Sequence, residues 1–437
     1  MSIIEIGPVF KRTDWLIIAL STSLTVIGIM FIYSSGINSV GLLVSDEYKK
    51  QIFWAILGFI LLIITLLVKP KILMDYAFWI YLGFIVLLIY TRIAGRVVNG
   101  SRSWIGIGSY GIQPSEFAKV ATIIFLSKYL SATKHEPNTF KRFLLSVLIA
   151  GIPFLLILAQ PDFGTAMVYI PIYLFIAFFL GINGKYLAFT VGVSATSILF
   201  VLLPLWQNLI REEPINILRI FYEAPYVYYL FALLSVVFIL ALLGHIYFKK
   251  RYYYWILFSI IIIFIGLILG LAAGKILKEY QMMRLIVFFD PNIDPLGSGW
   301  HILQSLTAIG SGGLGGKGFL LGTHSHYRYL PTQSTDFIFS IISEELGFIG
   351  VLLINLLFLV LLFRIYMIMK STKDMFSLGI CSGVSSLLIF HYIVNVGMTI
   401  GIMPITGIPL WFLSYGGSAL LTINIALGLV LAIGSRR

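Results

Sequence analysis

Asp336 is an acidic residue at a position where its carboxylate could take part in catalysis. It stands in the run Ser-Thr-Asp-Phe-Ile-Phe, where a long apolar stretch begins. A charged side chain in hydrocarbon costs several kcal/mol, so an acid at this edge is a candidate functional group. A carboxylate of this kind can act as a general base that takes a proton from a hydroxyl group. The alternative is a first-turn acid that helps to cap a helix.

Three further acidic positions lie against apolar runs. Glu116 and Lys119 are three positions apart, so on a helix they share one face and can pair, either as a structural ion pair or as functional groups. Asp162 follows a proline between two apolar runs, where it is either a turn or capping acid or part of a site. Glu344 and Glu345 lie further inside an apolar run, where we expect a structural role in helix packing.

A glycine-rich stretch surrounds Lys317. It resembles a nucleotide-binding loop but fails that pattern, because Ser311 replaces a required glycine and Gly318 a required Ser or Thr. Free backbone N–H groups beside the lysine can hold a phosphate, and a flexible lid is the alternative. His324 and His326 lack an evident third metal ligand, so we interpret them as surface-loop residues.

The composition identifies the elements that must position these residues. The chain has 437 residues, of which 59% are hydrophobic and 11% charged. Soluble domains are about one-quarter charged, so an ordinary soluble enzyme is excluded. We assign the net charge of +12 to lipid headgroups and membrane orientation, and not to nucleic acid. The single cysteine, Cys381, excludes an intramolecular disulfide.

Long apolar runs define the fold class. Roughly 20 apolar residues cross about 30 Å of hydrocarbon, and about twelve such runs occur. They predict an all-α polytopic membrane protein, a single membrane domain over 1–437 with a long extracytoplasmic loop at 275–336. The predicted spans lie near 15–35, 51–68, 73–93, 115–132, 143–160, 163–181, 186–206, 226–247, 253–274, 337–363, 375–397 and 409–434.

Basic residues in the short loops predict the orientation. With both termini in the cytoplasm, every cytoplasmic loop is basic, and the opposite orientation leaves few basic loops inside. The residues concerned are Lys11, Arg12, Lys69, Lys71, Lys128, Lys134, Lys141, Arg142, Lys185, Lys249, Lys250, Arg251, Arg364, Lys370, Lys373, Arg436 and Arg437. The acids then gather at the outer face. This favours either a transporter for a polar solute or lipid headgroup, or an enzyme acting on a lipid-linked substrate.

An ordered series of motifs resembles the SEDS family of bacterial cell-wall proteins, which includes RodA, FtsW and SpoVE. The motifs include Gln-Pro-Asp-Phe-Gly-Thr, Thr-Asp-Phe-Ile-Phe and Ser-Tyr-Gly-Gly-Ser, and some are more similar to RodA than to FtsW. They lie at 100–105, 113–119, 160–165, 290–291, 294–297, 304–305, 308–313, 322–323, 330–331, 335–339, 344–347, 404–409 and 414–418.

The resemblance implies a peptidoglycan glycosyltransferase that polymerises lipid II at the outer leaflet of the bacterial inner membrane, in cell elongation and shape maintenance. Undecaprenyl diphosphate is the expected leaving group and the reaction inverts the sugar. The expected partners are a class B penicillin-binding protein and elongation proteins such as MreC and MreD. The family's catalytic aspartate corresponds to Asp336. Its substrate-binding positions correspond to Arg102, Glu116, Lys119, Asp162 and Lys317, and a divalent cation (Mg or Mn) is possible at Glu116 or Asp162.

Departures from the family pattern concern the neighbours of Asp336 and the number of spans. Thr332 and Ser334 stand where the family often has Glu and His, Met282 replaces an arginine, and Ser103 replaces a basic residue. An added helical pair at 226–274 extends the family's core of ten spans. The competing functions are a lipid II flippase or solute transporter, and a non-catalytic scaffold for a transpeptidase. Acids at the outer surface favour the enzyme, because transporter sites usually lie near mid-bilayer.

Overall fold

The computed structural model describes residues 6–98, 100–107, 110–136, 139–209, 215–276 and 279–436. These residues are mainly helical. The helices are α1 (Ile6–Arg12), α2 (Trp15–Ser35), α3 (Glu47–Leu67), α4 (Pro70–Ala94), α5 (Pro114–Ala132), α6 (Thr139–Ala159), α7 (Phe163–Met167), α8 (Tyr169–Phe179), α9 (Gly184–Leu209), α10 (Tyr226–Phe248), α11 (Arg251–Ile276), α12 (Glu279–Ile286), α13 (Ser298–Gly312), α14 (Thr323–His326), α15 (Ile338–Ser371), α16 (Met375–Thr399) and α17 (Gly417–Gly434), with two 3-10 turns, η1 (Asn216–Phe221) and η2 (Pro291–Ile293).

Every predicted span corresponds to helix. Within the described ranges, ten helices are long and apolar enough to cross a membrane, and a shorter apolar stretch covers Phe163–Phe179. That stretch consists of α7 and α8, which join at Val168. The fourth predicted span is α5, whose Glu116, Lys119 and Lys128 make it the most polar of the set. The last span begins at Gly417 and not at 409, because the residues before it form a non-helical loop.

The chain divides into two compact units. Unit 1 comprises residues up to 182 and from 301 onward, and unit 2 comprises 183–300. In unit 1, α16 and α17 are the core helices. Of the most apolar 18-residue segment of each helix, 72% of the residues are buried in α16 and 89% in α17, against 17% in α4. Helices α5, α8 and α15 pack against α16, while α3 packs against α17. Polar groups on α16 are therefore enclosed by protein and must be paired there.

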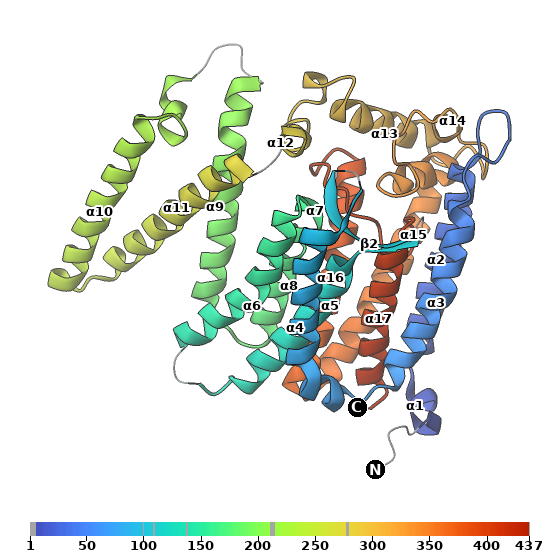
Figure 1. Cartoon of the computed structure of the whole chain (residues 1–437), viewed down its shortest axis with the longest axis horizontal. Coiled ribbons are helices and arrows are strands. Elements are labelled where there is room, and N and C mark those ends of the chain that lie inside the picture. Colours follow the sequence, from blue (N-terminus) through green and yellow to red (C-terminus); the bar gives the residue numbers. More distant parts are fainter. Residues whose placement is uncertain are drawn as a thin grey trace. The chain divides into compact units, whose positions relative to one another are not determined.

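The two ends of unit 1 carry different structural elements. One end carries α1 and the C-terminal end of α17, and the other carries α14 and the strands (Figure 1). The strands β1 (Arg96–Val98), β2 (Ser101–Ile107) and β3 (Tyr110–Ile112) form an antiparallel sheet in the order β1-β2-β3. Trp104 of β2 opposes Arg96, and Ile105 opposes Ile112. The segment predicted as a long loop at 275–336 contains α12, η2, α13 and α14, so much of it is helical.

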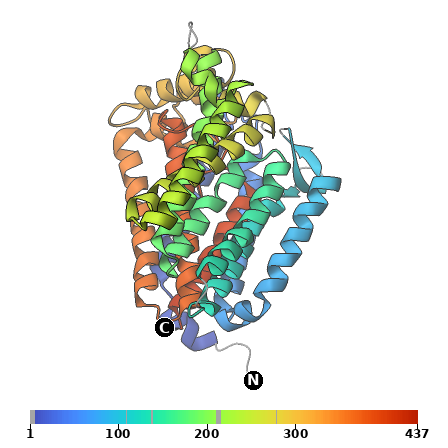
Figure 2. The same cartoon turned by 90° about the vertical axis from the view of Figure 1, so that its left-hand side faces the viewer.

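Unit 2 is built on α9, α10, α11 and α12. Helices α10 and α11 lie side by side as an antiparallel hairpin (Figure 2). Gly266 and Gly270 bring α11 close to α9, since a Cβ at Gly266 would lie 2.0 Å from Thr196 Oγ1 and one at Gly270 would lie 2.6 Å from Phe200 Cβ. Small residues four apart allow this approach in apolar helices. The helical character of 226–274 is confirmed, and its status as an insertion stays a prediction.

Candidate active site

Asp336 ends the turn that precedes α15. Its backbone N–H donates to the carbonyl of Thr332 at 3.0 Å, and the residue is half-buried. Phe337, and not Asp336, holds the N-cap position of α15. Because α15 begins at Ile338, Asp336 lies just before the first turn of the helix and not within it.

The backbone around Asp336 is held by the C-terminal part of the chain. The carbonyls of the three residues 334–336 each accept one hydrogen bond. Tyr415 N–H donates to the first at 2.8 Å, Ser414 Oγ to the second at 2.5 Å, and Asn395 Nδ2 to the third at 3.0 Å. Three successive backbone contacts fix the direction of this segment far more than its turn conformation alone would.

The loop between α16 and α17 is itself fixed. Asn395 Nδ2 also donates to the carbonyl of Ile408 at 2.8 Å, and Ser414 Oγ accepts from Leu410 N–H at 2.9 Å. Gln51 of α3 donates to the Ser414 carbonyl at 3.1 Å and accepts from the N–H of Gly416 at 3.2 Å. A buried glutamine thus uses its amide on both sides of the Ser-Tyr-Gly-Gly-Ser motif.

Glu116 and Lys119 form a buried ion pair in the first turns of α5. Lys119 Nζ lies 2.7 Å from Glu116 Oε1, and the two residues are 0% and 4% exposed. The predicted pairing on one helix face is confirmed. The lysine also lies 3.4 Å from His391 Nε2 and 5.4 Å from the ring centre of Trp411. Neither side chain has surface open to a substrate in this conformation.

Asp162 is the N-cap residue of α7. Its Oδ1 accepts from the N–H of Thr165 at 3.1 Å, and its Oδ2 accepts from Gln113 Nε2 at 2.7 Å. Gln113 in turn donates through its own N–H to Ser418 Oγ at 2.9 Å. Burial raises the pKa of Asp162, with hydrogen bonds from Thr165 opposing this and the Glu116 carboxylate adding to it. The capping alternative is borne out, and the residue also joins α7 to the start of α5.

Arg102 lies on β2 and is exposed. Its guanidinium donates to the carbonyl of Ile93 at 3.2 Å, at the C-terminal end of α4, where a cation is favourable. The neighbouring Ser101 Oγ donates to the carbonyl of Gln160 at 2.7 Å. The strand is therefore tied to the turn that carries Asp162.

Glu344 and Lys317 anchor the glycine-rich loop to the start of α15. Lys317 Nζ donates to Glu344 Oε1 at 2.7 Å and to Thr323 Oγ1 at 2.6 Å. The same carboxylate accepts from the backbone N–H groups of Thr323 and His324 at 2.8 and 2.9 Å. The lysine side chain is 26% exposed, and the glutamate is fully buried. The Lys317 ammonium group is thus hydrogen-bonded to residues of α14 and α15, and it remains partly exposed.

Glu345 binds the same loop from the next position. Its Oε2 accepts from the N–H of Leu320 at 3.0 Å, and its Oε1 accepts from Ser34 Oγ of α2. Gly347, with φ +65° and ψ −168°, interrupts α15 directly after these acids. The expected structural role of both acids is therefore borne out, and the break at Gly347 shows in addition that the helix is not continuous. Both acids sit on a short helical segment before a break, and they hold loop backbone as well as helix.

The predicted divalent cation does not fit the carboxylates as they are arranged. Asp162 uses both oxygens for Gln113 and Thr165, and Glu116 uses one for Lys119. Within the described ranges, no group of three or more His, Cys, Asp or Glu side chains has metal-binding geometry. His324 and His326 therefore belong to no such group. Burial lowers the pKa of His326.

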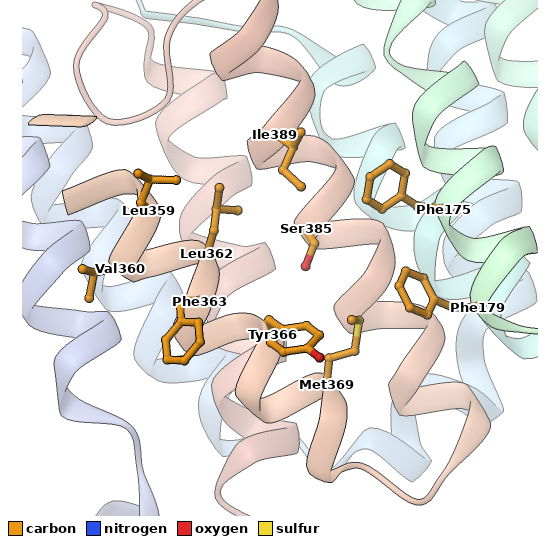
Figure 3. A pocket seen from close by; sticks show the side chains of 10 residues that line it. All are labelled: Phe175, Phe179, Leu359, Val360, Leu362, Phe363, Tyr366, Met369, Ser385 and Ile389. Carbon is orange, nitrogen blue, oxygen red and sulfur yellow. The ribbon is translucent and has the colours of Figure 1, made fainter. Parts of the chain in front are cut away.

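An apolar groove lies apart from these polar groups. It encloses about 600 Å³ between α8, α15 and α16, and its side chains are mostly aromatic or aliphatic (Figure 3). The lining residues are Phe175, Phe179, Leu359, Val360, Leu362, Phe363, Tyr366, Met369, Ser385 and Ile389. None carries a carboxylate or an amine, so the groove is not the candidate site.

Comparison with known proteins places the chain in a family. The family described as "Cell cycle protein" and named for FtsW, RodA and SpoVE matches residues 14–221 and 229–437. The chain belongs to the FtsW/RodA/SpoVE family. The predicted SEDS resemblance is confirmed, and with it the assignment as a multi-pass bacterial membrane protein.

Individual relatives of this SEDS protein cover almost its whole length. "Peptidoglycan glycosyltransferase RodA" of Treponema pallidum (strain Nichols) is 47% identical over 97% of this chain and 98% of its own. "Peptidoglycan glycosyltransferase MrdB" of Escherichia coli (strain K12) is 26% identical over 98% and 96%.

Solved structures share the fold. One, described as "Structural coordination of polymerization and crosslinking by a peptidoglycan synthase complex", has a TM-score of 0.65 at 25% identity and covers 97% of both chains. The rod shape determining protein RodA of Thermus thermophilus has a TM-score of 0.60 at 22% identity and covers 97% of both chains. The latter likeness concerns the fold alone.

Several residues that build this site were not predicted. Asn395 and His391 contact the Asp336 segment and Lys119 respectively, while Ser414 and Gln51 hold the closing loop. A signal for the first two was present in the sequence. A histidine and an asparagine four apart inside an apolar run must face protein, because lipid offers no hydrogen-bond partner.

Proposed function

We propose that this SEDS protein is a peptidoglycan glycosyltransferase that polymerises lipid II, with Asp336 as the general base. The observation that carries the proposal is the three-point hydrogen bonding of residues 334–336, which gives this one acid a fixed backbone. A relative at 47% identity bears the name of that activity. An acid on a fixed backbone can be placed within reach of a hydroxyl proton, which general-base catalysis requires.

The reaction follows from the substrate's chemistry. The hydroxyl oxygen of the incoming sugar forms a bond to the anomeric carbon of the growing strand, while the bond from that carbon to the lipid diphosphate breaks. Asp336 takes the hydroxyl proton, and the electron pair of the broken bond leaves with undecaprenyl diphosphate. Attack opposite the departing group inverts the anomeric carbon. Removal of the proton by the base contributes roughly 10²–10⁴-fold to the rate.

The cations have separate roles in this proposal. Arg102 is exposed, and Lys317 is partly exposed and already bound to Glu344, so these two are the candidates to bind the diphosphate. Positive groups aimed at developing negative charge lower the barrier most where water is scarce. Lys119 and Glu116 are buried and paired, and both carboxylate oxygens of Asp162 accept hydrogen bonds, so these three residues support the site without facing the substrate. We retain them as functional residues of the site without direct substrate contact.

The cellular setting extends the proposal. The chain would lie in the bacterial cytoplasmic membrane with its termini inside and Asp336 outside, and act in cell elongation. A class B penicillin-binding protein is the proposed transpeptidase partner, in line with the synthase complex whose structure shares this fold. MreC-like and MreD-like elongation proteins are further proposed partners.

The test is polymerisation of labelled lipid II by the purified chain. We expect the wild type to form glycan strands and Asp336→Asn to form none. Asp46→Asn is the matched control, because Asp46 is an exposed acid that pairs with the exposed Lys49. Equal polymerisation by wild type and Asp336→Asn would refute the base assignment. Lipid II movement across vesicles without polymer would favour a flippase, and growth of cells carrying only Asp336→Asn would favour a scaffold.

A further inference from the structure

We propose that His391 and Asn395 are a positioning pair that holds the Asp336 segment and the buried Glu116–Lys119 ion pair at a set separation. Both lie four residues apart on α16, so they share one face of a core helix. Both are fully buried. The inference rests on the proposed function, and it assigns these residues a positioning role and no contact with substrate.

Asn395 commits both of its donors. One side-chain amide group has two N–H donors, and here they reach the carbonyls of Asp336 at 3.0 Å and Ile408 at 2.8 Å. A carboxylate in this place would have no donor and would repel both carbonyls. The amide thus clamps the residue of the proposed base to the loop that follows α16.

His391 makes the corresponding contacts one turn earlier. Its Nδ1 lies 3.0 Å from the carbonyl of Pro409, which can only accept, so Nδ1 carries the proton. Its Nε2 lies 3.4 Å from Lys119 Nζ, and an ammonium group can only donate. The imidazole is therefore neutral, with Nε2 as acceptor. Its ring also packs against the ring of Trp411, with 4.0 Å between the ring centres and a tilt of 31° between the planes.

The two residues donate hydrogen bonds to successive carbonyls of the loop between α16 and α17. Ile408 and Pro409 are adjacent, and each accepts one hydrogen bond from α16. Besides these loop contacts, the Asn395 amide also donates to the carbonyl of Asp336, and the His391 imidazole also contacts Lys119. The spacing between the proposed base and the ion pair is therefore set by one turn of a rigid, buried helix. A misplacement of about 1 Å can cost on the order of 100-fold in rate, which gives this spacing its importance.

The kinetics of lipid II polymerisation by the full chain distinguish a role in positioning Asp336 from a role in helix packing alone. We expect Asn395→Asp, which keeps the shape and removes both donors, to lower kcat on the order of 100-fold with little change in KM for lipid II. His391→Phe should lower kcat likewise, and His391→Gln, which retains a donor and an acceptor, should recover most of it. Ser386→Ala is the control, because the Ser386 hydroxyl donates to the carbonyl of Gly383 within its own helix.

Each outcome decides the proposal. Wild-type kcat in both Asn395→Asp and His391→Phe would overturn it, and so would equal losses in His391→Gln and His391→Phe. If Asn395→Asp does not survive purification, the His391 pair carries the test, with thermal unfolding reported beside each rate. Failure of the proposed function gives a different result, because the wild type itself then forms no polymer, or Asp336→Asn polymerises like wild type.

Discussion

At the residue scale, Lys119 shows how this site departs from an ordinary membrane helix. It is fully buried, yet it has a carboxylate, an imidazole nitrogen and an indole face around its ammonium group. Breaking a buried ion pair by removing one partner costs about 3–5 kcal/mol, because the other charge is left unpaired. The pair is therefore a place where stability and activity can be separated by experiment.

Lys119→Met should leave Glu116 charged and unpaired, and so lower stability by about 3–5 kcal/mol. Thermal unfolding in detergent checks this. The double variant Lys119→Met with Glu116→Gln removes both charges and should recover most of the stability. If the pair has a functional role, the double variant stays inactive in polymerisation. Full activity in the double variant would show that the pair is structural only.

Asp162 should make stability depend on pH. Burial raises its pKa in the folded chain above the ordinary value of 3.8. The folded state thus binds this proton more tightly than the unfolded state does, and stability rises with protonation. This contribution is complete below about pH 4, the region of the unfolded pKa, and is lost as pH rises through the raised folded value.

The measurement is the unfolding midpoint as a function of pH for wild type and Asp162→Asn. Asn keeps an acceptor for the N–H of Thr165, so the cap is retained. The variant should show a flatter pH dependence and equal or higher stability at neutral pH. If the wild type instead lost stability relative to Asp162→Asn as the pH was lowered, the raised pKa of Asp162 would be contradicted.

At the element scale, the break in α15 sets where the glycine-rich loop can lie. Gly347 adopts φ +65° and ψ −168°, a region of backbone space that is essentially restricted to glycine. A Cβ at this position would lie 2.2 Å from the backbone nitrogen of Gly316. The helix break and the loop are therefore in direct contact, and Glu344 and Glu345 complete the attachment with side-chain hydrogen bonds.

Gly347→Ala should detach the loop from the start of α15. The strain is about 1–3 kcal/mol from the backbone alone, before the clash with Gly316 is counted. We expect faster proteolytic cleavage within 313–322 and reduced polymerisation. Gly310→Ala is the matched control, because a Cβ at Gly310 would meet nothing within 4 Å. Equal cleavage rates in the two variants would mean that the loop does not depend on this contact.

At the scale of the whole molecule, the orientation in the membrane is the property on which the extracytoplasmic chemistry depends. In unit 1, the strands and α14 lie at the end opposite α1 and the C-terminus (Figure 1). Lipid II polymerisation at the outer leaflet requires the end with the strands to face outward. Basic residues near the other end predict that orientation.

Cysteine labelling checks the orientation directly. The chain has one cysteine, Cys381, which is buried, so a Cys381→Ser background is free of other thiols. A membrane-impermeant reagent applied from outside should label Asp46→Cys, whose side chain is exposed, and should spare Lys373→Cys. The reverse pattern would place Asp336 on the cytosolic side and defeat the proposed function.

The sequence was sufficient for the helical spans and the family, and the role of Asp336 stays a prediction. Transfer of a helix into a membrane depends on the summed apolarity of neighbouring residues, so each predicted span contains a helix, and ten of the described helices are long and apolar enough to cross a membrane. The motif around Asp336 is likewise local. The burial of Lys119, the three contacts to residues 334–336 and the tasks of Asn395 and His391 were decided only by the tertiary structure. Their hydrogen bonds join residues far apart in the chain, and only the packing of α5, α15 and α16 determines which groups meet.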